Sequence, residues 1–193
     1  RPLEALPAFA DRPLLFEPGS EYRFSRYGWI VMSAAIEAAA DQPFLTFMHQ
    51  RIFQPLGMTA TRADAGPEEV PDLATFYFPR FGADPRYGLH LMRPLDYSCY
   101  AGASVFLSTP SDLVRFAMAI DDGKLLQPAT VQVLQASQQL PSGQKTGYAL
   151  GWDLETVTLA GEPTQVVGHD GESLGGRVVS LMTFREHGIV VAV

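Results

Sequence analysis

The β-branched and aromatic residues that favour strands gather behind the turn residues Pro141-Ser142-Gly143, and this segregation constrains the fold most strongly. Four short runs of this kind follow one another there: Tyr148–Leu154, Gln165–Gly168, Gly176–Phe184 and Ile189–Val193. Such runs, separated by turn residues, predict β-strands. Arg185–Gly188 has the length and the final glycine of a hairpin loop. We therefore expect an antiparallel sheet over about residues 146–193.

Helical patterns dominate the part of the chain before this sheet. Gly28–Ala40 is apolar on nearly every face, which predicts a buried helix, and Ser25 is placed to cap its start. A second helix is expected from Asp41 to Gly57, where apolar residues recur at helical spacing. A further helix is expected after Thr109, with Thr109 as its N-cap and Asp112 as the carboxylate of a capping box.

Helices that precede a terminal antiparallel sheet indicate an α+β organisation. The length of 193 residues allows one domain with a sizeable core. We expect a single domain over 1–193, with about 1–145 mainly helix and loop and about 146–193 sheet. Between Thr59 and Ser98 the periodicity fades among scattered Pro, Gly and aromatic residues. We interpret this stretch as a long ordered excursion that lines a site.

Charge and composition exclude several classes of function. The chain has 14 basic and 21 acidic residues, a net charge of −7, and no Lys/Arg cluster, which disfavours nucleic acid as a partner. Cys99 is alone, so it excludes an internal disulfide and a cysteine zinc site. The histidines lack a metal-ligand spacing, and we expect neither a metal nor a cofactor.

The two ends of the sequence read as internal. No signal peptide and no membrane span is recognisable. The sequence begins at Arg1 without an initiator methionine and stops inside the predicted strand Ile189–Val193. We expect further segments on both sides. Without them, the last strand would have an unpaired edge and the Gly28–Ala40 helix an exposed apolar face.

Seven segments carry a family resemblance when they are taken together in chain order. They are Phe16-Glu17-Pro18-Gly19, Phe24–Trp29, Ile52–Met58 with Thr61, Ala101-Gly102, Leu107–Leu113 with Phe116, Tyr148–Trp152, and Gly168-His169-Asp170-Gly171. Their order resembles the serine β-lactamase and penicillin-binding-protein superfamily, and within it the class C-like branch of β-lactamases, D-alanyl-D-alanine peptidases and esterases. The resemblance runs from about residue 14 to 193. It implies a β-lactamase/transpeptidase-like fold that is incomplete at both ends.

The resemblance also implies three catalytic elements around one substrate carbonyl: Ser-x-x-Lys, Tyr-x-Asn, and Lys-Thr-Gly or His-x-Gly on the edge strand of the sheet. The third element is matched. His169 would face the cleft, Gly171 would allow close backbone approach, and the N–H of Glu172 would be an oxyanion donor. The second element differs from the Tyr-x-Asn of the family, because Phe24 stands at the Tyr position and Arg26 at the Asn position. Phe24 cannot relay a proton, whereas Arg26 can bind a carbonyl or carboxylate.

Plainer interpretations stand beside these assignments. Taken alone, Gly168-His169-Asp170-Gly171 would be a hairpin turn with its polar residues in solvent. Tyr22 and Tyr27 are interpreted as packing residues beside the buried helix. Ser142-Gly143-Gln144-Lys145 has the Ser-x-x-Lys spacing, but it follows a proline, contains a glycine and comes after the second element. We interpret it as a loop and expect the nucleophilic serine and its lysine to lie outside this sequence.

The functional expectation follows from the resemblance. It implies a serine hydrolase that acts on amide, lactam or ester bonds through an acyl-enzyme. Its substrate would be a small molecule or peptide, such as a peptidoglycan-like compound, a β-lactam or an ester. Esterase or unusual peptidase activity is favoured over β-lactamase activity, because Phe24 and Arg26 replace the Tyr and Asn of the second element. The 193 residues alone are expected to be inactive.

The alternative is a non-catalytic homologue that binds peptidoglycan fragments or a protein partner. Loss of both residues of the second element supports it. The resemblance also suggests an exported bacterial protein, either periplasmic, secreted or anchored to a membrane.

Overall fold

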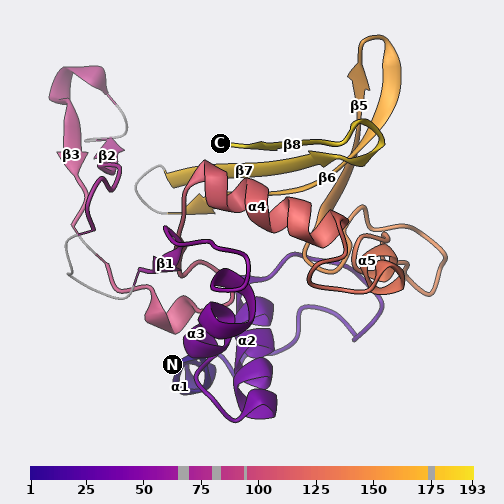
Figure 1. The fold of residues 1–193 in the computed structure, drawn as a ribbon. Coiled ribbons are helices and arrows are strands. Elements are labelled where there is room, and N and C mark those ends of the chain that lie inside the picture. The colour runs from indigo at the N-terminus through magenta and orange to yellow at the C-terminus, as the bar shows by residue number, and fades with distance from the viewer. Residues whose placement is uncertain (65–69, 80–83, 94, 174–176) are drawn as a thin grey trace.

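A helical part and a four-stranded antiparallel sheet make up the fold, as the segregation of strand-forming residues predicts (Figure 1). The structure is a computed structural model that describes residues 1–64, 70–79, 84–93, 95–173 and 177–193. The α-helices are α1 (Pro2–Ala5), α2 (Arg26–Ala40), α3 (Phe44–Met48), α4 (Pro110–Asp121) and α5 (Pro128–Leu134). Short 3-10 or π segments are η1 (Leu6–Ala8), η2 (His49–Phe53), η4 (Pro85–Tyr87), η5 (Ser98–Tyr100) and η6 (Arg185–His187).

The main sheet has the strand order β5-β6-β7-β8, and every neighbouring pair is antiparallel. Its strands are β5 (Asp153–Leu159), β6 (Glu162–Ser173), β7 (Arg177–Phe184) and β8 (Ile189–Ala192). The predicted strand start at Gly176 lies outside the described residues. The η6 segment and Gly188, with a φ of 63°, join β7 to β8 at the predicted hairpin loop. Helix α4 packs along one face of this sheet (Figure 1).

The segment Gly168-His169-Asp170-Gly171 is not a turn but part of the long strand β6. Its residues pair in register with β7, from Gly168 opposite Met182 to Gly171 opposite Val179. Neither glycine has the positive φ that a turn would need. The turn lies instead at Ala160 and Gly161, whose φ angles are 51° and 89°. This two-residue connection joins β5 to β6 and was not recognised from the sequence.

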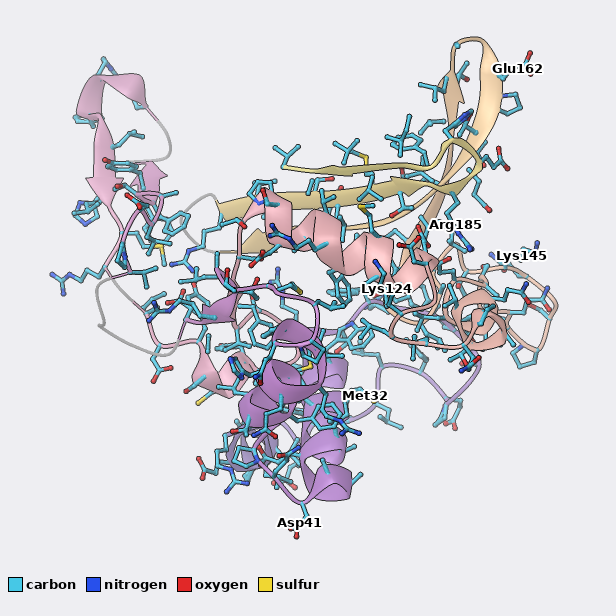
Figure 2. All side chains as sticks on the ribbon, viewed as in Figure 1. Met32, Asp41, Lys124, Lys145, Glu162 and Arg185 are labelled. Atoms are coloured by element: carbon cyan, nitrogen blue, oxygen red, sulfur yellow. The ribbon has the colours of Figure 1, made fainter. Side chains whose placement is uncertain are left out.

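Helix α2 begins as the sequence predicts but is only partly buried. The Ser25 hydroxyl accepts a hydrogen bond from the Gly28 N–H at 3.2 Å and caps the helix. One face of α2 is buried at Ile30, Ser33, Ala34 and Glu37. On another, Val31 is 48% and Met32 52% exposed, so α2 has the exposed apolar face that is expected from the sequence for residues 1–193 alone. Figure 2 shows Met32 on the side of α2 away from α3.

The buried face of α2 contacts the Ala101-Gly102 segment closely. The Ser33 hydroxyl donates to the Ala101 carbonyl at 2.7 Å. A Cβ atom at Gly102 would lie 2.5 Å from the Trp29 carbonyl oxygen and 2.7 Å from the Ser33 Cβ. Gly102 also has a φ of 85°, so only glycine fits this contact without strain.

Helix α4 is capped by Thr109, whose side chain accepts from the Asp112 N–H at 3.3 Å. The buried Asp112 carboxylate does not complete a capping box; it accepts from the Ala60 N–H at 3.0 Å and the Thr61 hydroxyl at 2.9 Å. This contact ties α4 to the start of the excursion. The excursion contains two small antiparallel pairs, β1 (Arg62–Ala63) with β4 (Phe106–Leu107), and β2 (Tyr77–Pro79) with β3 (Leu89–Leu91).

Two clusters form the core. One lies between α4, α5 and the sheet and includes Ile120, Trp152, Val167 and Leu181. The other lies between α3 and the end of the excursion and includes Phe44, Tyr97 and Val105. Among the helices that the structure describes, none has the length and apolar character needed to cross a membrane.

Candidate functional site

One half of β6 has an uncovered side, and the predicted site residues lie there. Strand β5 pairs with β6 only as far as Asp153 opposite Gly168, whereas β7 pairs with β6 up to Arg177 opposite Ser173. The segment 169–173 is therefore paired on one side only among the described strands. The edge strand that the resemblance implies corresponds to this open half of β6.

Arg26 crosses from the first residue of α2 to this open side. Its Nη2 donates to the Glu172 carbonyl oxygen at 2.5 Å, which joins two residues 146 positions apart in sequence. In an antiparallel strand the N–H and C=O of one residue point to the same side. The Glu172 N–H therefore points to the same open side as its carbonyl, toward Arg26. The Asn position and the expected oxyanion donor thus lie side by side.

His169 is held by hydrogen bonds at both ring nitrogens. Its Nδ1 lies 2.7 Å from the Asp170 carbonyl oxygen, and its Nε2 lies 3.1 Å from the Tyr148 hydroxyl oxygen. The Phe24 ring lies 5.8 Å from the His169 ring and 6.2 Å from the Tyr148 ring, centroid to centroid. Phe24, at the Tyr position, is thus placed beside the His-x-Gly element, and it is 45% exposed.

Tyr148 is a site residue that sequence reasoning missed. Its motif was used for the resemblance, but no spacing signal connects it with His169. The pKa of Tyr148 is raised to about 12, mainly by burial and also by the nearby ionisable groups of Tyr22 and Asp153, whereas an interaction with Trp29 opposes the shift. The hydroxyl of Tyr148 consequently stays protonated over the physiological pH range.

The neighbouring tyrosines pack as the sequence predicts. Tyr22 stacks on Tyr148 with ring centroids 5.2 Å apart, and burial is the main cause of its raised pKa. Tyr27 stacks on Phe9 at 4.5 Å, and the Arg12 guanidinium lies 5.7 Å from the Tyr27 ring centroid. The Tyr22, Phe24 and Tyr148 rings thus form an aromatic wall beside His169.

Packing against β7 explains why β6 carries glycine at positions 168 and 171. A Cβ at Gly168 would lie 2.4 Å from the Leu181 carbonyl oxygen, and a Cβ at Gly171 would lie 2.5 Å from the Val179 Cγ1. Contact with strand β7 therefore requires a small residue at both positions. Close approach of a substrate would be a second reason for glycine at position 171.

The remaining sequence candidates do not join this site. Ser142-Gly143-Gln144-Lys145 lies in a loop with Gly143 at a φ of 84°, and Figure 2 shows Lys145 beside α5. The interpretation of this segment as a loop is confirmed. Among the described residues, no group of three or more His, Cys, Asp or Glu side chains is arranged to hold a metal ion.

Comparisons with known proteins agree with the motif order. The family model described as Beta-lactamase matches residues 2–193. The mitochondrial serine beta-lactamase-like protein LACTB of Mus musculus is 30% identical over 118 residues, which are 61% of this chain and 20% of that protein. Penicillin-binding protein 4* of Bacillus subtilis (strain 168) is 25% identical over 163 residues, which are 81% of this chain and 36% of that protein.

Solved structures show the same fold. D-amino acid amidase from Ochrobactrum anthropi SV3, in complex with L-phenylalanine amide, superposes with a TM-score of 0.80 at 20% identity. The match covers 100% of this chain and 55% of that enzyme chain. The present chain therefore spans about half the length of this structural relative, and 20% and 36% of the two curated relatives.

Proposed function

Because the chain belongs to the beta-lactamase family, we propose that it forms one wall of the cleft of a serine hydrolase. The enzyme cleaves an amide, lactam or ester bond through an acyl-enzyme. A serine oxygen attacks the carbonyl carbon and its proton passes to a neighbouring base. The amine or alcohol then leaves, and water releases the acid. The observation that carries this proposal is the open half of β6, with the Glu172 N–H facing Arg26.

Each wall residue has a role in this proposal. The Glu172 N–H donates to the developing oxyanion, since a fixed backbone donor stabilises the charge that forms in the transition state. His169 and Arg26 are polar groups that orient the substrate. The guanidinium of Arg26 uses one N–H on the Glu172 carbonyl and makes no other hydrogen bond within the described part of the chain. It can therefore still donate to a carbonyl or carboxylate of the substrate.

The aromatic wall favours some substrates over others. Phe24 has no hydroxyl to pass a proton to a leaving amine, and an alcohol leaving group needs less help from an acid. We therefore favour an ester or an activated peptide-like amide over a β-lactam. The serine and lysine are expected outside residues 1–193, so these residues alone are expected to be inactive. A bacterial, exported enzyme with a peptidoglycan-like substrate remains part of the proposal by resemblance.

Covalent labelling of the natural full-length protein tests this function. A fluorescent fluorophosphonate and a fluorescent penicillin are added separately to the folded protein and to a heat-denatured control. We expect the fluorophosphonate to label the folded protein only, and the penicillin to label it more slowly. The variant Ser142→Ala is the matched control and should label like the wild type, because Ser142 lies in a distant loop. Absence of labelling by both probes on well-folded protein would contradict the proposal.

A second candidate is a non-catalytic homologue that binds peptidoglycan fragments or a protein partner. One observation favours it: the Arg26 guanidinium spans the open side of β6 where a substrate amide would otherwise be received. Calorimetric titration with a soluble muropeptide separates the two candidates. Saturable muropeptide binding without covalent labelling supports the second; labelling supports the first.

A further inference from the structure

We propose that Tyr148 is a positioning residue that fixes the tautomer and orientation of His169 and supplies the phenolic hydroxyl missing at Phe24. The effect on catalysis rests on the proposed function, whereas the effect on His169 itself does not. The pair joins two elements: Tyr148 lies in the loop before β5, and His169 lies on the open half of β6.

The hydrogen bonds on His169 determine which nitrogen carries the proton. The Asp170 carbonyl oxygen can only accept, so the Nδ1 at 2.7 Å from it must carry a hydrogen. In the neutral ring the Nε2 is then an acceptor. The Tyr148 hydroxyl at 3.1 Å is therefore the donor to Nε2. Tyr148 thereby stabilises the neutral Nδ1–H tautomer.

The surroundings of Tyr148 support the same direction of donation. Its raised pKa keeps the hydroxyl protonated, and an interaction with Trp29 opposes that shift. The protonated phenol keeps its O–H available for donation to Nε2, which lies 3.1 Å away. With 8% of its surface exposed, Tyr148 is also held firmly by its neighbours.

Protonation of His169 reverses the bond. A proton taken up at Nε2 makes this nitrogen a donor, and the Tyr148 oxygen becomes its acceptor. The O–H of Tyr148 is then released to donate to another acceptor beside the Phe24 ring. The ionisable groups on the elements around the Tyr148–His169 pair come from three places. Tyr22 precedes α2 and Arg26 is its first residue, Asp153 is on β5, and Asp170 and Glu172 are on β6.

The Tyr148 hydroxyl lies near position 24, where phenylalanine has no hydroxyl of its own. The Phe24 ring contacts both members of the pair, at 5.8 Å from His169 and 6.2 Å from Tyr148. A hydroxyl group is therefore present in the neighbourhood of the Tyr position although residue 24 lacks one.

Nitrogen NMR of His169 tests the positioning role without any activity. The full-length protein is labelled with ¹⁵N-histidine and measured at mildly alkaline pH, where histidine side chains are neutral. We expect the Nδ1–H tautomer in the wild type, and a change of about fivefold in the tautomer ratio in Tyr148→Phe, because one hydrogen bond is lost. Tyr22→Phe removes a hydroxyl from the stacked neighbour and should leave the ratio unchanged. An unchanged ratio in Tyr148→Phe, or an equal change in Tyr22→Phe, would overturn the proposal.

Kinetics with the fluorophosphonate test the catalytic consequence. Tyr148→Phe should slow labelling about tenfold, because the hydrogen bond that fixes the tautomer and orientation of His169 is lost, with little change in affinity for the probe. The double variant Phe24→Tyr/Tyr148→Phe should regain part of the rate, because it returns a hydroxyl to the Tyr position. Equal rates for wild type and Tyr148→Phe would overturn the catalytic part. If even the wild type is not labelled, the proposed function fails, and the NMR result alone decides the role of Tyr148.

Discussion

Gly168 and Gly171 meet strand β7 through different atoms, and this difference sets how each tolerates a side chain. The Gly168 α-carbon faces the backbone oxygen of Leu181, which is held by the sheet. The Gly171 α-carbon faces a Val179 methyl group, which belongs to a side chain that is 39% exposed and can yield more easily than backbone. From the sequence, both glycines were assigned to a turn or to substrate approach. The register with β7, which no local pattern encodes, gives the stronger reason.

A comparison of two alanine variants measures this difference. We expect Gly168→Ala to lower the free energy of unfolding by at least about 2 kcal/mol, because backbone must move. Gly171→Ala should cost about 1 kcal/mol, since the valine can turn aside. Urea denaturation of both variants is the measurement. Equal losses would show that the contact with the Leu181 carbonyl does not dominate.

The raised pKa of Tyr148 predicts a loss of stability at alkaline pH. The unfolded chain releases this proton near pH 10.0, whereas the folded protein keeps it until about pH 12. Between these pH values ionisation of the phenol stabilises the unfolded state only. The free energy of unfolding therefore falls by up to about 3 kcal/mol because of this residue. Tyr148→Phe lacks the effect. The stability difference between wild type and variant should therefore shift in favour of the variant as pH rises through this window, and a constant difference would argue against a buried phenol.

At the scale of elements, local signals predicted where helices begin but not how strands pair. Ser25 and Thr109 cap α2 and α4 because a hydroxyl accepts from a nearby backbone N–H, and this depends on neighbouring residues only. Three of the four predicted strand runs coincide with β6, β7 and β8, whereas the run Tyr148–Leu154 was placed too early, because β5 covers Asp153–Leu159. The extent of β6 was missed, because pairing with β7 carries it through two glycines that would otherwise end a strand.

Asp112 shows how one side chain joins elements that are far apart in sequence. Its carboxylate is 1% exposed and accepts from Ala60 and Thr61, and Arg115 forms an ion pair with it at 2.7 Å. Asp112→Ala leaves buried donors without partners, and we expect a loss of about 3 kcal/mol. Asp122→Ala, which removes the exposed ion pair with Lys124, is the control and should cost less than about 0.5 kcal/mol. Calorimetric melting of both variants decides, and similar losses would refute the buried role.

At the scale of the whole molecule, a part-buried ion pair ties the excursion to the sheet. Arg177 at the start of β7 donates to Asp64 at 2.5 Å, and the two side chains are only 18% and 12% exposed. Its guanidinium also lies 4.0 Å from the Phe76 ring centroid. These partners come from segments far apart in sequence. The sequence indicated an ordered excursion, yet no periodic pattern shows which strand it contacts.

Removal of this ion pair should loosen the excursion. Asp64→Asn leaves the part-buried guanidinium of Arg177 without its carboxylate partner, at a cost of about 2 kcal/mol. Relative to the wild type, we expect Asp64→Asn to speed amide hydrogen exchange in residues 70–79 and 84–93 more than in β6. Asp84→Asn breaks the exposed pair with Arg86 within the same segment and serves as the control. Unchanged exchange in Asp64→Asn would show that other contacts hold the excursion.

The exposed apolar residues of the molecule match the fold-level expectation from the sequence. Val31 and Met32 on α2 are about half exposed, and β8 pairs only with β7 among the described strands. The family assignment needed the order of all seven motifs, since each motif is short and recurs by chance. The site needed the tertiary structure, because Arg26 meets Glu172, and Tyr148 meets His169, only through folding.

The site of covalent modification decides whether the protein is a serine hydrolase. The full-length protein is treated with a fluorophosphonate, digested, and its peptides are sequenced by mass spectrometry. We predict a single adduct on the serine of a Ser-x-x-Lys sequence outside residues 1–193, formed more slowly when the open half of β6 is disrupted by Gly171→Trp. An adduct on Ser142, or no adduct on folded protein, would contradict this prediction.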